Sequence, residues 1–242
     1  MKPRLRAPAK LNLELRVLGR RPDGSHEVRT LIQAISLADE LIVEPADRAS
    51  IEVTGFRVPV GESNLALRAA QRLGRPARIQ LEKRIPPGAG LGGGSSDAAA
   101  VLRELGGDRG DLLEIASELG ADVPFFLRGG RARASGRGEV LEPQPDQQLW
   151  FAIAWPGFQI STASVYQKWD EVGGEGRNEL QRAAEAVEPR LAAFALRLGA
   201  EWTMTGSGSA FYRIAADAAE ARQAVAGFDG WTAVAESEPR WS

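Results

Sequence analysis

The sequence predicts an α+β protein in which antiparallel sheets carry helices packed on them. Three observations lead to this fold class. Apolar and polar side chains alternate with the period of β-strands at the start of the chain, and capped helical segments follow. The remainder then runs strand, helices, strand, turn, strand, helix, strand. With 242 residues, of which 43% are hydrophobic, the chain is long and apolar enough to bury a full core.

Strands dominate the predicted opening. Leu11, Leu13 and Leu15 alternate with polar residues, so one face of this first strand is expected to be buried. Lys10 and Asn12 then share its polar face. The segment RRPDGSHE has the Pro-Asp-Gly chemistry of a turn, and VRTLIQAISLADELIVEP and SIEVTGFRV follow as further strands.

Helices are predicted next. Asn64 is a suitable cap for the helix LALRAAQRLG, which ends at Gly74, and ARIQLEKRI then alternates as a strand that leads into a glycine-rich loop. Residues 95–97, Ser-Ser-Asp, are good capping residues for the helix AAAVLREL. A further helix, DLLEIASELG, leads into ADVPFFLRGG.

A domain boundary is expected near residue 147, because EPQPDQQ has the composition of a linker and precedes a new apolar strand, LWFAIAWP. The first domain is therefore assigned to residues 1–147 and the second to residues 148–242. Beyond the boundary we expect a Ser/Thr segment ISTASVYQKW, helices across residues 179–198, the segment EWTMTGSGSAFYRI, a helix in DAAEARQAVAG and a last strand WTAVAE.

Composition narrows the function classes. Thirty Lys and Arg against 32 Asp and Glu give a formal charge of −2, so no global field favours nucleic acid or an anionic membrane. The chain has no cysteine, which excludes thiolate zinc sites and cysteine nucleophiles. Its one histidine, His26, excludes an H-E-x-x-H metal site. With no apolar run of signal-peptide or membrane-span length, we expect a cytoplasmic protein.

The stretch IPPGAGLGGGSSDAAA has glycine at five of the seven positions from Gly88 to Gly94. Bare backbone brings N–H groups close to a ligand, and the helix start beyond it offers free donors, so the expected ligand is a phosphate. The Walker A pattern fails because its lysine is missing. The pattern G-x-G-x-x-G is matched literally, but the preceding strand is amphipathic, which argues against a dinucleotide fold. A flexible surface turn would explain fewer glycines.

Four long stretches carry a specific resemblance. PPGAGLGGGSSDAAA resembles the ATP-phosphate loop of the superfamily of galactokinase, homoserine kinase, mevalonate kinase and phosphomevalonate kinase, and TGSGSAFY resembles its third, glycine-rich motif. APAKLNLELRVLGRRPDGSHEVRTLIQAISLADEL and GADVPFFLRGGRARASGRGEVLEP are similar to one branch, the 4-diphosphocytidyl-2-C-methyl-D-erythritol kinases. The matches span most of the chain in the right order.

The resemblance implies a reaction and an architecture. A kinase of this branch transfers the γ-phosphoryl of ATP to the 2-hydroxyl of a cytidine diphosphate-bearing methylerythritol, in the non-mevalonate route to isoprenoids. ATP with Mg²⁺ is implied as co-substrate, without a dedicated carboxylate cage for the metal. The superfamily's two domains are an N-terminal ATP-binding domain like domain 2 of ribosomal protein S5 and a ferredoxin-like C-terminal domain. The oligomeric state is not implied.

The resemblance also implies roles for individual residues. Asp122 matches the catalytic aspartate, able to accept the hydroxyl proton, and Lys10 matches the catalytic lysine beside the transferring phosphoryl group. The positions implied to bind ATP are Asn64, Pro87, Gly88, Ala89, Gly90, Leu91, Gly92, Gly93, Gly94, Ser95 and Ser96. The positions implied to bind the acceptor substrate are Asn12, His26, Thr162, Tyr166, Gly206, Ser207 and Gly208.

Without the family, these residues have ordinary interpretations. Lys10 would be a solvated strand-end lysine, Asp122 and Asn64 helix caps, Tyr166 an aromatic at the edge of the core, and TGSGS a tight hairpin turn. Two other functions also stay open: a kinase of the superfamily for another small alcohol such as mevalonate or homoserine, and a nucleotide-binding protein without catalysis.

One position departs from the branch. The branch usually has an aromatic residue in DGYHE, stacked on the cytosine, whereas this chain reads DGSHE with Ser25. A lost base stack costs about 1–3 kcal/mol. The consequence is weaker substrate binding, a different substrate, or an aromatic ring supplied from elsewhere, for which Tyr166 and Trp169 are the candidates.

Overall fold

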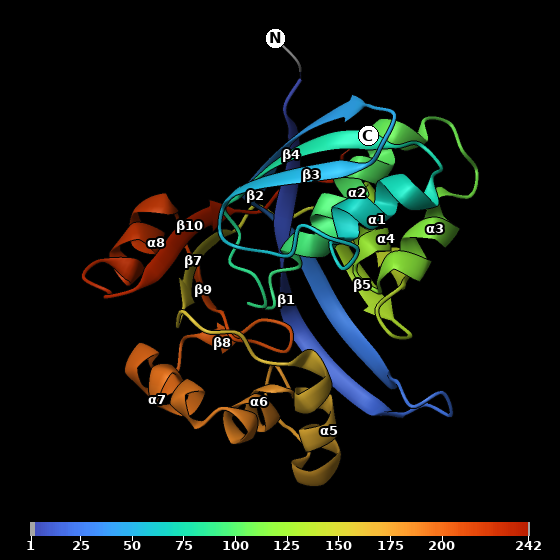
Figure 1. Ribbon diagram of the computed structural model, residues 1–242. Helices are drawn as coiled ribbons and strands as arrows, with labels where there is room; N and C mark the ends of the chain where they lie inside the picture. The colour runs from blue at the N-terminus through green and yellow to red at the C-terminus, as the bar shows by residue number, and fades with distance from the viewer. Residues whose placement is uncertain (1–2, 242) are drawn as a thin grey trace.

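Two β-sheets organise the computed structural model, which describes residues 3–241 (Figure 1). The first sheet has the order β3-β4-β2-β5-β6, and β1 pairs with β2. The second sheet has the order β10-β7-β9-β8. The strands of the first sheet are β1 (Leu5–Arg20), β2 (His26–Pro45), β3 (Ser50–Gly55), β4 (Ala77–Lys83), β5 (Arg131–Ser135) and β6 (Val140–Pro143). Those of the second sheet are β7 (Trp150–Trp155), β8 (Thr203–Met204), β9 (Phe211–Ala215) and β10 (Trp231–Glu236). The predicted α+β fold with largely antiparallel sheets is confirmed.

Strand β1 belongs to the first sheet and packs against the second, and its residues 7–13 are buried on both faces. Leu11 and Leu13 pack with Phe151 and Tyr212 of the second sheet, as the alternation predicts. On the other face, Lys10 and Asn12 are each only 4% exposed. The predicted polar face of β1 is therefore buried at Lys10 and Asn12, whereas Glu14 and Arg16 are exposed.

One strand pair departs from the antiparallel expectation. β3 and β4 pair in parallel, with Ile51 opposite Ile79. The helix α1 (Leu65–Arg72) connects them, and a helical crossover of this kind returns the chain in the same direction. Asn64 caps α1 as predicted, because its side chain accepts hydrogen bonds from the backbone N–H groups of Ala66 and Leu67.

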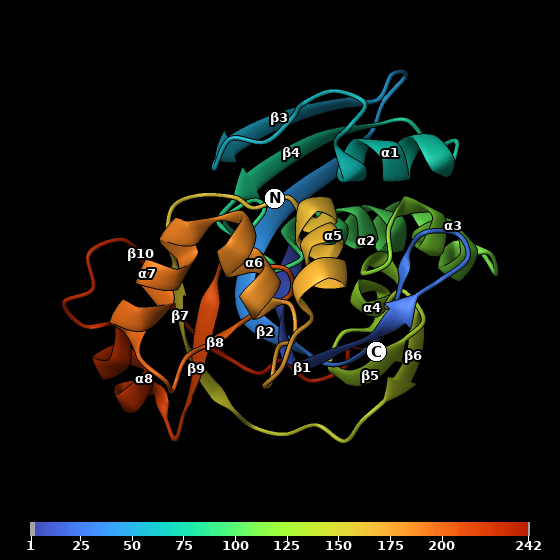
Figure 2. The ribbon, with the colours of Figure 1, turned by 90° about the horizontal axis from the view of Figure 1, so that it is seen from below.

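Helices α2 (Gly93–Gly106), α3 (Leu112–Leu119) and α4 (Val123–Arg128) complete the layer on the first sheet (Figure 2). Ala98, Ala99 and Ala100 of α2 are at most 1% exposed, and such small side chains let this helix lie close to its neighbours. The expectation that residues 95–97 cap this helix is wrong. Gly92, with φ of +74°, precedes the helix, and residues 93–97 already belong to it.

The second sheet packs against the first sheet on one face and against the helices of the C-terminal half on the other. Phe151 and Ile153 of β7 face β1, whereas Ala152 and Ala154 face helices. These helices are α5 (Thr162–Val172), α6 (Gln181–Val187), α7 (Pro189–Leu198) and α8 (Ala218–Val225), and Figure 2 shows α6–α8 apart from α1–α4. The predicted helices at 179–198 and in DAAEARQAVAG are present, and the predicted Ser/Thr segment forms α5, capped by Ser161.

The connection between the sheets runs from the end of β6 at Pro143 to the start of β7 at Trp150. The last described residues return to the first layer, where Trp241 packs against its core. The division at residue 147 stays a prediction. Within residues 3–241, no helix has both the length and the apolar composition needed to span a membrane.

Candidate active site

A cavity of about 780 Å³ opens where the glycine loop, β1 and the segment 205–208 meet. All of the positions implied by the resemblance line it except Ser96, which is fully buried in the first turns of α2. The lining residues that were expected are Lys10, Asn12, His26, Asn64, Pro87, Gly88, Ala89, Gly90, Leu91, Gly92, Gly93, Gly94, Ser95, Asp122, Thr162, Tyr166, Gly206, Ser207 and Gly208.

The glycine loop contains backbone conformations with positive φ, which only glycine adopts easily. Gly88, Gly90 and Gly92 have φ of +61°, +78° and +74°. At Gly90 a Cβ would lie 2.2 Å from the carbonyl oxygen of Thr205, so a side chain there has no room. The loop therefore touches the second glycine-rich segment directly, although the two are far apart in the sequence.

Two backbone hydrogen bonds fix the loop between the two halves of the chain. The Lys10 N–H donates to the Leu91 carbonyl at 2.9 Å, and the Ala210 N–H donates to the Ala89 carbonyl at 3.0 Å. The loop then enters α2 through Gly92, so the free N–H groups of the first turn of α2 face the same cavity. This is the geometry that phosphate groups prefer.

Lys10 and Asp122 both line the cavity and face each other there. Lys10 Nζ lies 3.7 Å from Asp122 Oδ2, and the Lys10 side chain is 5% exposed against 35% for Asp122. Asp122 precedes α4, but its side chain makes no capping hydrogen bond, so the interpretation as a helix cap fails. The carboxylate is therefore available to a ligand in the cavity.

A chain of hydrogen bonds orients Lys10. Its Nζ donates to Asn12 Oδ1 at 2.5 Å, and Asn12 Nδ2 donates to Thr30 Oγ1 at 2.8 Å. The Asn12 backbone N–H donates to Thr205 Oγ1 at 2.9 Å. Lys10 is thus a buried, oriented cation and not a solvated strand-end lysine.

Asn178 supports the glycine-rich segment 205–208 from behind. It is 2% exposed, and its Nδ2 donates to the carbonyls of Met204 at 2.7 Å and Gly206 at 2.8 Å. Its Oδ1 also accepts from the Leu180 N–H at 3.0 Å. In the sequence, an asparagine before a predicted helix resembles an ordinary cap, so nothing there distinguishes it.

His26 marks the other end of the cavity. Its ring stacks on Tyr166, with centroids 4.8 Å apart and planes at 28°, and its Nε2 lies 2.7 Å from Asp170 Oδ1. Trp169 contacts His26 edge-on at 6.1 Å and does not line the cavity. Burial, and then the charge of Asp122, raises the pKa of Tyr166 to about 12, so this ring stays neutral. Of the two candidates, Tyr166 is therefore the aromatic ring that lines the cavity and could stack on a base in place of an aromatic residue at position 25.

A buried triad, which the sequence reading missed, lies under the glycine loop. Lys83 Nζ contacts Asp39 and lies 2.8 Å from Asp97 Oδ2, and all three side chains are at most 4% exposed. Burial opposes the charge on Lys83, but Asp97 and Asp39 outweigh it and raise the lysine pKa. Burial raises the pKa of Asp97 to about 7 despite the opposing charge of Lys83.

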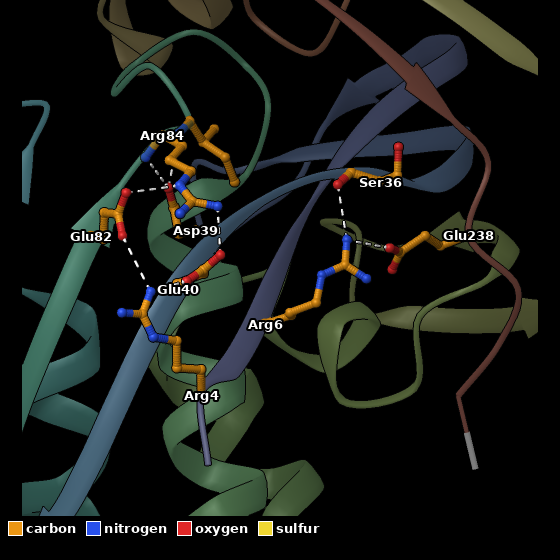
Figure 3. A network of polar contacts seen from close by, with 9 residues as sticks. Arg4, Arg6, Ser36, Asp39, Glu40, Glu82, Arg84 and Glu238 are labelled. Carbon is orange, nitrogen blue, oxygen red and sulfur yellow. Dashed lines mark hydrogen bonds and ion pairs between the residues drawn. The ribbon is translucent and has the colours of Figure 1, made fainter. Parts of the chain in front are cut away.

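Asp39 connects this triad to the start of the loop. Its Oδ1 accepts hydrogen bonds from the N–H groups of Arg84 at 2.6 Å and Ile85 at 2.8 Å. Figure 3 shows that the Arg84 side chain instead joins a surface network of ion pairs with Glu40 and Glu82. Exposed pairs of this kind contribute little, so the buried Asp39 is the stronger anchor.

Comparison with known proteins agrees with this geometry. Residues 64–130 match the family GHMP kinases N terminal domain. The 4-diphosphocytidyl-2-C-methyl-D-erythritol kinase of Solibacter usitatus is 42% identical over 88% of this chain and 81% of its own length.

Solved structures give the same result. A crystal structure of 4-(cytidine 5'-diphospho)-2C-methyl-D-erythritol kinase superposes with a TM-score of 0.80 at 38% identity, covering 97% of this chain and 99% of its own. A mevalonate kinase, at 10% identity, a TM-score of 0.67 and full coverage of both chains, shares the fold. The chain therefore belongs to the 4-diphosphocytidyl-2-C-methyl-D-erythritol kinase family, within the GHMP kinase fold.

Proposed function

We propose that this protein transfers the γ-phosphoryl group of ATP to the 2-hydroxyl of 4-diphosphocytidyl-2-C-methyl-D-erythritol. The observation that carries the proposal is the pairing of Lys10 with Asp122 at 3.7 Å, in a cavity that has a glycine loop at one end and His26 with Tyr166 at the other. A protein that only binds nucleotide has no need of a carboxylate base there. The family of this chain supplies the identity of the acceptor.

In the proposed mechanism the protein positions its substrates and neutralises charge. The N–H groups of the glycine loop and of the first turn of α2 hold the triphosphate. Asp122 accepts the proton of the 2-hydroxyl while the hydroxyl oxygen forms a bond to the γ-phosphorus. The bond between the γ-phosphorus and the bridging oxygen breaks, and that oxygen leaves as part of ADP. Lys10, held by Asn12, lies beside the transferring group and balances its charge.

The substrate end of the cavity supports a cytidine. Tyr166 gives an aromatic face already in contact with His26, and the histidine ring offers hydrogen-bonding atoms to a base edge. The stack that an aromatic residue at position 25 would supply is absent, since Ser25 is bound to Asp23. We therefore propose that Tyr166 is the main platform for the base.

Mg²⁺ is proposed as the partner of ATP. The described residues contain no group of three or more His, Cys, Asp or Glu arranged to hold a metal, so the phosphates would supply most ligands. The oxygen donors nearby fit a hard cation: Asp122 and Ser95 line the cavity, and the buried Ser96 Oγ has no partner among the described residues. Bound Mg²⁺ would neutralise phosphate charge. We also propose that the enzyme works in the cytoplasm, where ATP is abundant.

The test measures ADP release with Mg²⁺ and ATP on the cytidyl substrate, beside mevalonate, homoserine and galactose, with mass spectrometry to detect one added phosphoryl group. Turnover of the cytidyl substrate alone is expected. Turnover of another alcohol instead would keep the kinase and reject this acceptor. Asp122→Asn should lower kcat by about 10²- to 10⁴-fold with unchanged ATP affinity, and a normal rate in this variant would remove Asp122 from the mechanism.

A further inference from the structure

Two arginines of the cavity have no role in the mechanism above. Arg20 is the last residue of β1, and Arg137 lies in the turn between β5 and β6. Both line the cavity, although the two turns are far apart in the sequence. Both lie in stretches that resemble the family branch, but the sequence analysis gives neither of them a role.

The turn that carries Arg137 contacts two separate parts of the structure around the cavity. On one side, the Val28 N–H donates to the Gly136 carbonyl at 2.8 Å, close to His26 in the chain. On the other side, a Cβ at Gly138 would lie 3.9 Å from Asp122 Oδ1. Arg137 therefore stands between one residue that contacts the start of β2, near His26 in the chain, and another that lies beside the proposed catalytic carboxylate.

Arg20 lies beside the same end of β2, on the neighbouring strand β1. It is the register partner of His26 in the β1–β2 pair, and its Nη2 would lie 3.8 Å from a Cβ at Gly24. The charge of Arg137 also acts on the turn between β1 and β2. Hydrogen bonds from Ser25 lower the pKa of Asp23 in this turn, and the charges of Arg21 and Arg137 lower it further. Both guanidinium groups thus flank the turn that precedes His26.

Both cations are weakly partnered. The Arg20 side chain has no hydrogen bond or ion pair with any residue in the described range 3–241. Arg137 has one loose ion pair, with its Nε 3.7 Å from Glu139 Oε1 and its side chain 48% exposed. The acidic groups that line the cavity have other partners, since Asp122 faces Lys10, Asp170 faces His26 and Asp97 faces Lys83. The two arginines therefore have free capacity for an anion.

We infer that Arg20 and Arg137 bind the diphosphate of the acceptor substrate. This rests on the proposed function: if the base lies on Tyr166 and the 2-hydroxyl lies at Asp122, the diphosphate that joins them must cross the space flanked by the two turns. Guanidinium groups bind phosphate oxygens through paired, charge-assisted hydrogen bonds. The arginines then select for a nucleoside diphosphate ester over a neutral small alcohol.

The first test compares the variants Arg20→Gln, Arg137→Gln and their double in steady-state kinetics. Each single variant should raise KM for the cytidyl substrate about tenfold, and the double more, with KM for ATP and kcat within about threefold of the parent. Arg78→Gln is the matched control, because its side chain is 50% exposed and paired with Glu52 at 3.0 Å outside the cavity. A rise in KM for ATP alone would assign the arginines to ATP and overturn the inference.

The second test measures binding of CDP and of cytidine by calorimetry. In the parent, CDP should bind at least tenfold more tightly than cytidine, and this gain should disappear in the double variant while cytidine still binds. Retained cytidine binding also shows that the variant is folded. A gain that persists in the double variant would overturn the inference even if the parent is an active kinase. Conversely, an arginine-dependent gain in a parent that does not turn over the cytidyl substrate would reject the proposed function and keep the diphosphate site.

Discussion

The folded protein should lose stability as the pH rises from 5 to 8, and replacing Asp97 by Asn should remove this loss. Asp97 lines the cavity beneath the glycine loop and is only 3% exposed. Its Oδ2 accepts from Lys83 at 2.8 Å, and its Oδ1 has no partner among the described residues. Burial of the ionised form is the main reason that its pKa rises from the ordinary 3.8 to about 7. Lys83 stays charged throughout this range, since its own pKa is raised.

The sign follows from which state holds the proton more tightly. Because the folded-state pKa lies above the unfolded value, the carboxyl group stabilises the fold fully below pH 3.8, and this contribution is lost as the pH rises through about 7. The slope approaches 1.4 kcal/mol per pH unit between the two values. Between pH 5 and pH 8, the parent should therefore lose stability, by about 2–3 kcal/mol, relative to a variant that cannot titrate at this position.

The assay is urea unfolding of the parent and of Asp97→Asn at half-unit steps from pH 5 to pH 8. The asparagine still offers an oxygen to Lys83, and all other titrating groups cancel in the difference between the two curves. Asp111→Asn, at an exposed pair with Arg109, serves as control and should give a flat difference over this range. A difference between parent and Asp97→Asn that does not change with pH would refute the reasoning.

Three further predictions concern the loop, the triad and the histidine. Gly90→Ala places a methyl group 2.2 Å from a backbone oxygen at φ of +78°, so it should cost about 3 kcal/mol of stability in urea unfolding and raise KM for ATP. Lys83→Met leaves two buried carboxylates without their counter-charge and should cost about 3–5 kcal/mol in the same assay. Asp170→Asn weakens the contact that orients the His26 ring and should raise KM for the cytidyl substrate about three- to tenfold, with KM for ATP unchanged.

Each of these has an internal control. Gly94→Ala is matched to Gly90→Ala, because Gly94 is helical and its nearest neighbour to a Cβ is 3.9 Å away, so stability should be unchanged or higher. Lys168→Met, at an exposed pair with Glu171, should leave stability nearly unchanged. An unchanged KM in Asp170→Asn would show that the ring orientation comes from Tyr166 alone.

The sequence predicted those parts of the fold and site that depend on local chemistry. Alternation placed Leu11 and Leu13 in the core, and Asn64 caps its helix as expected. The predicted start of α2 was wrong because capping residues are a local signal. The chain turns earlier, at Gly92, which has a positive φ and packs tightly against the side chains of Phe126 and Lys10. Poor helix formers such as Gly93 are then helical because the tertiary position demands it.

The triad shows a signal that was present and misread. Ala77, Ile79 and Leu81 are the buried residues of β4, and Lys83 continues the same period of two, so its position in the strand already predicts burial. A lysine is normally assigned to solvent, since only a partner of opposite charge makes its burial tolerable. Those partners, Asp39 and Asp97, come from distant segments, which the local pattern does not reveal.

The free edge of β1 explains how distant motifs form one site. β1 pairs with β2 along one edge, and within residues 3–241 no strand pairs with its other edge. Instead, Lys10 donates its backbone N–H to Leu91, Asn12 donates to the Thr205 hydroxyl, and Leu15 exchanges hydrogen bonds with Arg177 and Glu179. These three N–H groups, which an exposed edge would leave unpaired, are thus satisfied by segments from other parts of the chain. The same strand that presents Lys10 therefore fixes the glycine loop and the segment 205–208 in register with it, so a shift of β1 by one residue would dismantle the catalytic pair and both ligand loops together.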